Sequence, residues 1–87
     1  MISIIVAALK NGGVITETSD FAYVKFNRMS IDKDTQARYW VMVYDHNESQ
    51  YVLTEVLMDL ETLEADFVGC PELEGGFEEV LEAYVAK

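Results

Sequence analysis

Two β-rich segments joined by one short polar connector restrict this chain to folds built on an antiparallel hairpin. Residues 38–44 (Arg-Tyr-Trp-Val-Met-Val-Tyr) give the strongest strand signal, and residues 50–58 (Gln-Tyr-Val-Leu-Thr-Glu-Val-Leu-Met) form the predicted return strand. The connector, residues 45–49, is Asp-His-Asn-Glu-Ser, a composition typical of turns. The sequence therefore predicts two central antiparallel strands.

A third strand is predicted before this hairpin. Residues 14–16 are Val-Ile-Thr, and residues 21–26 alternate, which places Phe21, Tyr23 and Lys25 on one face. Residues 27–37 are polar and rich in turn-forming types, so we expect a loop there.

Apolar residues at helical spacing predict three helices around the strands. Residues 2–10 carry one apolar stripe; a strand is the alternative, because Ile-Ile-Val is β-rich and Asn-Gly, which follows, favours hairpins. A second helix is predicted over residues 60–68 with Asp59 as N-cap, and a third over residues 77–85. The expected class is α+β, in the order α-β-β-β-α-α, with helices on one face of a small antiparallel sheet of two or three strands.

Length and composition predict a single domain over residues 1–87. The chain is 51% hydrophobic and 25% charged, which is typical of globular proteins, and its apolar fraction leaves room for a homodimer face. Cys70, the single cysteine, has no internal disulfide partner, which favours a reducing cytoplasm. The apolar run before Lys10 is too short for a membrane span, so we expect core there and no membrane association.

Charge is distributed unevenly along the chain, whose net charge is −10. No Lys or Arg occurs between Tyr39 and Ala86, and residues 55–87 hold ten acids with Lys87 as their one base. This balance argues against direct nucleic-acid binding, which depends on Lys and Arg contacts to phosphate, and favours a basic protein partner. The candidate partner-binding acids are Asp59, Glu61, Glu64, Asp66, Glu72, Glu74, Glu78, Glu79 and Glu82.

On the predicted helices these acids form rows. Glu78 and Glu82 are four residues apart, and Glu61 and Glu64 are three apart, so each pair lies about 5–6 Å apart on a helix surface. Such rows can imitate the phosphates of a nucleic-acid strand. The alternative is that the acids serve solubility alone.

The aromatic residues of the hairpin also have two interpretations. Tyr39, Trp40, Tyr44 and Tyr51 either fill the sheet core or, where exposed, anchor a partner. His46 and Cys70 lie in different connectors, and we expect a surface histidine and a small buried thiol. Because the sequence has no metal-ligand spacing and no glycine-rich phosphate loop, we expect no enzyme, no metal and no cofactor.

In size and acidity the chain resembles small phage-encoded anti-defence proteins, which include anti-CRISPR proteins and DNA mimics. The resemblance covers general character only and transfers no site residues. It implies a non-enzymatic inhibitor that occupies the cationic nucleic-acid-binding surface of a host nuclease or CRISPR-type complex, in the host cytoplasm if phage-encoded. The alternatives are a homodimeric structural or adaptor module and an antitoxin-like regulator, each with a solubilising acidic face.

Overall fold

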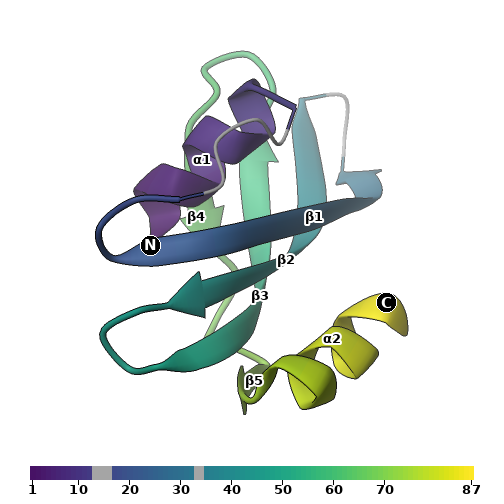
Figure 1. The fold of residues 1–87 in the computed structure, drawn as a ribbon. Helices are drawn as coiled ribbons and strands as arrows, with labels where there is room; N and C mark the ends of the chain where they lie inside the picture. The colour runs from purple at the N-terminus through teal and green to yellow at the C-terminus, as the bar shows by residue number, and fades with distance from the viewer. Residues whose placement is uncertain (13–16, 33–34) are drawn as a thin grey trace.

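The computed structural model describes residues 1–12, 17–32 and 35–87, and only the backbone is considered for residues 27–32. These residues form two helices and five strands (Figure 1). The elements are α1 (Ile2–Lys10), β1 (Phe21–Asp32), β2 (Gln36–Asp45), β3 (Gln50–Asp59), β4 (Ala65–Phe67), β5 (Leu73–Gly75) and α2 (Phe77–Val85). The α+β class is confirmed, whereas the predicted order α-β-β-β-α-α and the sheet of two or three strands are wrong. The predicted strand at residues 14–16 lies outside the described residues.

A single antiparallel sheet holds all the described strands, in the order β1-β2-β3, with β4 and β5 both on the outer edge of β3. β2 and β3 pair without interruption from Gln36↔Asp59 to Asp45↔Gln50, which confirms the predicted hairpin. β4 pairs with one end of β3 and β5 with the other. Pro71 lies between these two short strands, where its missing N–H cannot contribute to a ladder.

The helix predicted over residues 60–68 is wrong, because this segment makes one turn and then pairs with β3. The backbone N–H of Leu63 donates to the Asp59 carbonyl, as in a helix, but Leu63 itself has a left-handed φ of 62°. The Asp59 N–H then donates to the Glu64 carbonyl and closes a hairpin. The backbone N–H and C=O groups on the outer edge of β3 require hydrogen-bond partners. Pairing with them stabilises the strand β4 more than the helical spacing of the leucines stabilises a helix.

The loop predicted over residues 27–37 is also wrong for residues 27–32 and 36–37, which are strand, whereas residues 33–34 lie outside the described residues. β1 continues to Asp32 and pairs with β2 through Asn27↔Trp40 and Asp32↔Gln36. In the sheet order β1 is the edge strand, and polar residues are tolerated at a sheet edge. The strand therefore extends through a segment whose composition is typical of loops.

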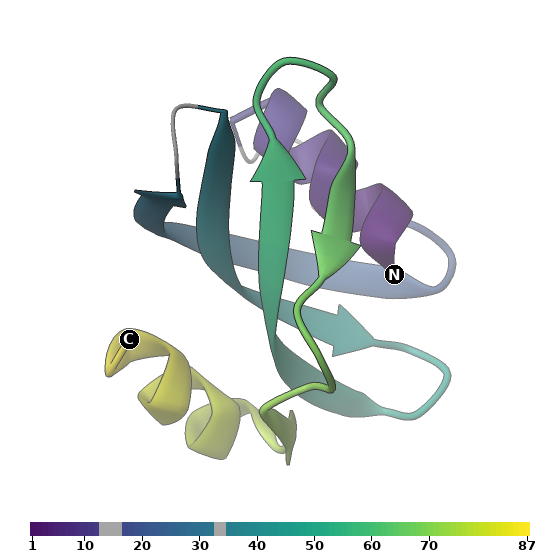
Figure 2. The same cartoon turned by 180° about the vertical axis from the view of Figure 1, so that it is seen from behind.

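The two helices cover opposite faces of the sheet, which corrects the prediction that all helices lie on one face. α1 buries Ile4, Ile5 and Ala8 in a core with valines of β1, β2 and β3. α2 buries Val80 in a second core with Trp40 and residues of β2 and β3. Figures 1 and 2 show α1 beside β4 at one end of the sheet and α2 beside β5 at the other.

A β-bulge in β1 changes the faces on which its aromatic residues lie. The register with β2 shifts within residues 22–25, and Tyr23 has a left-handed φ of 56°. As a result Phe21 packs in the α1-side core together with Val24, whereas Tyr23 packs in the α2-side core. The prediction that Phe21 and Tyr23 share a face is wrong. Left-handed backbone costs a tyrosine about 1–3 kcal/mol, which the contacts of its ring must offset.

Candidate protein-binding surface

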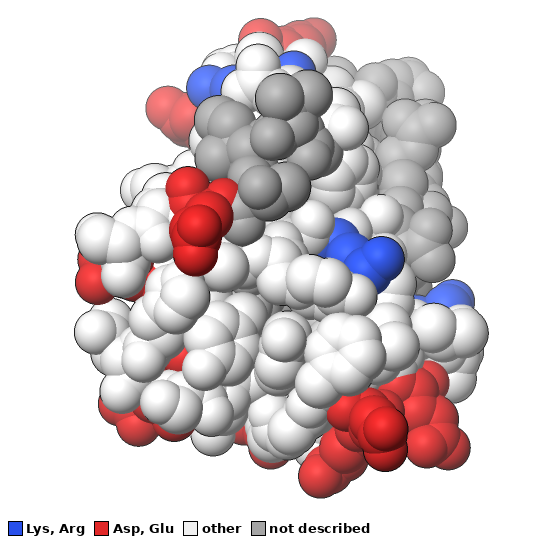
Figure 3. All heavy atoms as spheres, in the orientation of Figure 1, with Lys and Arg blue, Asp and Glu red and all other residues white. Residues whose placement is uncertain are grey.

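The helix α2 fixes three exposed carboxylates on its outer side. Val80 is fully buried and turns one side of the helix to the sheet, while Glu78, Glu79 and Glu82 are exposed. We call these three the α2 acidic surface; acidic side chains over α2 form the red cluster at the lower right of Figure 3. Glu78 and Glu79 lie in the first helical turn, where the helix dipole stabilises negative charge.

The acids predicted on the preceding helix do not join this surface. Because residues 60–68 are not helical, Asp59, Glu61 and Glu64 lie at the β3–β4 turn and Asp66 lies on β4. Figure 1 shows that this turn and α2 are at opposite ends of the sheet. The predicted row of acids over two helices is therefore reduced to one helix.

The remaining predicted acids, Glu72 and Glu74, lie on the segment that leads into α2 and are already engaged. Glu72 forms an ion pair with Lys87, and Glu74 Oε2 accepts a 2.9 Å hydrogen bond from Gln50 Nε2. Lys87 is further held with its Nζ 4.4 Å from the centre of the Trp40 ring. Lys87, the one base in the acidic half of the chain, therefore contacts Glu72 and Trp40 and not the glutamates of α2.

The α2 acidic surface is electrostatically uncompensated within the described residues. Arg38, a base on the same side of the sheet as α2, donates from Nη1 to Glu55 Oε2 at 2.8 Å. In the described part of the chain, none of Glu78, Glu79 and Glu82 has an ion-pair or hydrogen-bond partner. The mutual repulsion of these carboxylates is left for solvent ions or a partner to neutralise.

A cluster of aromatic side chains lies at the N-terminus of α2. The ring of Tyr51 is 5.7 Å from Tyr23, 5.2 Å from Phe77 and 4.7 Å from Tyr44, measured between centroids. Phe77 also meets Tyr23 edge-on at 5.4 Å and keeps 38% of its surface exposed. We call these four residues the aromatic cluster. Phe77 directly precedes Glu78 in the chain, so the cluster presents an apolar contact beside charge.

The four predicted aromatic anchors do not all lie on the same face of the sheet. Tyr44 and Tyr51 belong to the aromatic cluster, whereas Trp40 is 9% exposed and forms part of the core beneath α2. Tyr39 lies on the opposite face, against the α1-side core. The sequence predicts neither Tyr23 nor Phe77 as an anchor. The bulge that turns Tyr23 toward α2 has no signal in the alternation of β1, and residues 77–85 are predicted only as an amphipathic helix.

Burial also affects the tyrosine at the far end of α2. Tyr84 packs against the α2-side core, and this burial raises the pKa of its hydroxyl above the ordinary value. The neighbouring Tyr23 hydroxyl raises the pKa of Tyr84 further. Tyr84 is therefore neutral at physiological pH, and its hydroxyl adds no charge to this region.

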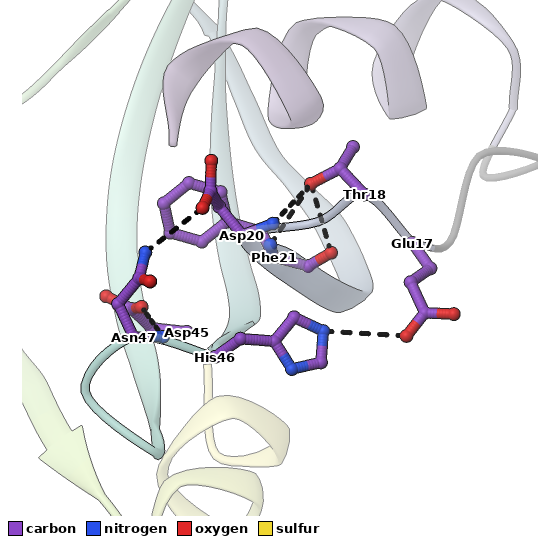
Figure 4. Close-up of polar contacts among 7 residues, drawn as sticks. All are labelled: Glu17, Thr18, Asp20, Phe21, Asp45, His46 and Asn47. Carbon is purple, nitrogen blue, oxygen red and sulfur yellow. Dashed lines mark hydrogen bonds and ion pairs between the residues drawn. The ribbon is translucent and has the colours of Figure 1, made fainter.

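A polar clasp holds the start of β1 to the β2–β3 turn (Figure 4). The backbone N–H of His46 donates to the Asp20 carbonyl at 2.9 Å, and Asn47 Nδ2 donates to Asp20 Oδ1 at 3.3 Å. His46 Nε2 lies 3.5 Å from Glu17 Oε2. Figure 4 draws this contact as a dashed line between the two side chains. The clasp fixes the end of the sheet that carries Tyr44, and its polar groups are used in structural contacts.

Asp59 has a structural role at the β3–β4 turn and not the helix-capping role predicted for it. Its Oδ1 accepts hydrogen bonds from the backbone N–H groups of Glu61 at 2.8 Å and Thr62 at 3.0 Å. The N–H of Thr62 first, and that of Glu61 second, hold the pKa of Asp59 below its ordinary value. These bonds favour the carboxylate form in the folded state.

Replacement of Asp59 by Ala is expected to lower the urea midpoint of unfolding by an amount that depends on pH. A lowered folded-state pKa stabilises the fold above the unfolded pKa of about 4, and this stabilisation is lost as the pH falls through the folded value. The difference between wild type and Asp59→Ala should be constant near neutral pH and should shrink below about pH 4. Asp59→Asn is the control, because it keeps the acceptor oxygen but does not titrate. A difference that is unchanged at low pH contradicts this role.

Two sequence expectations, on metal ligands and on Cys70, can be compared with the described residues. Among them no group of three or more His, Cys, Asp and Glu side chains is placed to hold a metal ion. Cys70 is exposed, so the prediction of a buried thiol is wrong. Neither helix of the described chain has the length and apolar character to cross a membrane.

No family model, no curated protein and no solved structure matches the chain. The surface is therefore interpreted from its own geometry.

Proposed function

We propose that this chain is a non-enzymatic inhibitor that occupies the cationic nucleic-acid-binding surface of another protein, such as a nuclease or a CRISPR-type complex. The observation that carries the proposal is the α2 acidic surface, whose carboxylates are exposed and unpaired within the described residues while Lys87 and Arg38 are paired elsewhere. Charge of one sign that is presented without compensation attracts a partner of opposite charge and accelerates association.

The geometry favours a narrower contact than a mimic of a long nucleic-acid strand. Glu78 and Glu82 lie one helical turn apart, about 5–6 Å, which is the spacing of a short run of phosphates and not of an extended strand. The exposed edge of Phe77 and its neighbour Tyr51 supply apolar contact beside the carboxylates. In this arrangement the acids set the association rate and the aromatic cluster slows dissociation.

The test is a capture experiment with immobilised protein in a nuclease-treated bacterial lysate. We expect a basic nucleic-acid-binding protein to be retained at low salt, displaced by added DNA or RNA, and weakened as salt shortens the Debye length from about 10 to 3 Å. The aromatic contacts should leave part of the complex intact at high salt. A partner that is indifferent to both salt and nucleic acid contradicts the proposal, as does the absence of any basic partner.

A further inference from the structure

The C-terminal end of α1 carries an Asn-Gly pair that the proposed function does not use. Asn11 is the cap residue of α1, and Gly12 follows it with a left-handed φ of 62°. Both residues are exposed. Glycine adopts this conformation readily because it has no Cβ, and the same absence leaves its backbone nitrogen open to approach by the preceding side chain.

We propose that Asn11 is a site of spontaneous deamidation, at which the chain converts this asparagine to aspartate or isoaspartate without an enzyme. In the first step the backbone nitrogen of Gly12 attacks Cγ of Asn11. A bond forms between these two atoms, the bond from Cγ to Nδ2 breaks, and the amide group leaves as ammonia with the proton of the Gly12 nitrogen. The product is a five-membered succinimide ring.

Water opens this ring in the second step. Cleavage of the bond between Cγ of Asn11 and the Gly12 nitrogen leaves aspartate in a normal backbone. Cleavage of the bond between the backbone carbonyl carbon and the same nitrogen leaves isoaspartate. The sum of the two steps consumes one water and releases one ammonia, and it requires no oxidant or reductant.

The attacking nitrogen is unhindered and unoccupied within the described residues. A Cβ built on Gly12 would meet no described atom within 4 Å. In the same part of the chain the Gly12 N–H donates no hydrogen bond. The attacking species is the deprotonated amide, and an amide that donates no hydrogen bond gives its proton to solvent base more easily.

One side-chain hydrogen bond restrains the group that is attacked. Asn11 Nδ2 donates to the Ala7 carbonyl at 2.9 Å, and the backbone N–H of Asn11 donates to the same oxygen at 3.1 Å. The side chain must leave this bond before Cγ can reach the Gly12 nitrogen. The net strength of a single exposed hydrogen bond corresponds to a factor of about ten in rate, so the fold delays the reaction and does not prevent it.

Asn47 is the matched comparison within the same chain. It is also exposed, but the backbone N–H of Glu48, which follows it, donates to Asp45 Oδ1 at 3.3 Å. The side chain of Asn47 is held as well, because its Nδ2 donates to Asp20 Oδ1 at 3.3 Å. Since the attacking nitrogen at this position is engaged and belongs to a residue with a long side chain, Asn47 should remain intact while Asn11 reacts.

Deamidation weakens the end of the helix that Asn11 caps. The new carboxylate has no N–H to donate to the Ala7 carbonyl, and it places negative charge at the C-terminal end of α1, where the helix dipole favours positive charge. Isoaspartate also lengthens the backbone by one methylene at this point. Because α1 contributes Ile4, Ile5 and Ala8 to the α1-side core, the modified chain should unfold at a lower urea concentration.

Incubation of the folded protein at mildly alkaline pH, followed by peptide mass spectrometry, tests the proposal. We expect residue 11 to gain about one dalton, at a rate that rises with pH and lies within about tenfold of the rate in urea. Asn11→Gln should prevent this gain, because its longer side chain must close a six-membered ring. Asn11 that is still intact in the folded protein after about ten half-lives of the reaction in urea overturns the proposal, and so does equal modification of Asn47.

The effect on α1 is measured on designed variants. Asn11→Asp, which is the direct product, should have a lower urea midpoint than Ser49→Asp, which adds the same charge at an exposed residue of the β2–β3 turn. Equal midpoints would overturn the assigned effect on α1. None of these measurements requires a binding partner, so their outcome is independent of the proposed inhibitor function.

Discussion

Replacement of Val80 by Asp is expected to release α2 from the sheet and to destabilise the domain by about 3–5 kcal/mol. Val80 is the one fully buried residue of α2, and its side chain lies in the core formed with Trp40, Met42 and Leu53. A carboxylate placed there is surrounded by apolar side chains and must either stay charged in an apolar site or take up a proton.

Trp40 reports on this change, because it is the single tryptophan of the chain and is 9% exposed beneath α2. We expect its fluorescence to shift to longer wavelength in Val80→Asp, and the urea midpoint to fall. Val85→Asp adds the same charge to the same helix at a residue that is 71% exposed, and should change stability by no more than about 0.5 kcal/mol. Equal losses in the two variants would show that net charge, and not the packing of α2, limits stability.

The parts of the fold that the sequence predicted are those in which local pattern and tertiary environment agree. The hairpin of β2 and β3 is rich in β-branched and aromatic residues, and both strands are central in the sheet. Residues 2–10 and 77–85 have apolar residues at helical spacing, and each forms a helix that buries an apolar side against the sheet: Ile4, Ile5 and Ala8 on α1, and Val80 on α2. Here the burial of each apolar side reinforces the local preference.

The errors arise where an edge of the sheet decides the structure. Residues 60–68 have helical spacing but supply backbone partners to β3, and residues 27–32 have a loop-like composition but form an edge strand. Neither demand is local, because it depends on which strand happens to be unpaired in the assembled sheet. The placement of helices on both faces was indicated by β2, whose alternate residues are apolar on both sides, a pattern typical of a sheet covered twice.

The candidate site was predictable only where the predicted helix forms. The acids of α2 were placed correctly because they follow from a helix that does form, whereas Asp59, Glu61, Glu64 and Asp66 moved with the segment that does not. Tyr23 could not be assigned, because a bulge with left-handed backbone at a tyrosine has no sequence signal.

Reversal of the α2 acidic surface, Glu78→Lys, Glu79→Lys and Glu82→Lys together, is expected to abolish binding to the basic partner while the fold survives. All three side chains are exposed, so the triple variant removes no core contact. Against a cationic surface each reversal replaces attraction by repulsion. A loss of at least about 4 kcal/mol over the three positions corresponds to roughly a thousandfold in affinity. Titration of the captured partner, at fixed ionic strength, measures this loss.

The matched control reverses Glu48, Glu61 and Glu64, which are exposed in the β2–β3 and β3–β4 turns away from α2. Both triple variants change the net charge by the same amount, so they share any loss of long-range steering. If α2 makes the contact, the control should slow association and leave dissociation nearly unchanged, because it removes no carboxylate from the interface. Equal loss of affinity in the two variants would refute a localised surface, and it would assign the acids to a general field that keeps the chain soluble and attracts bases without specificity.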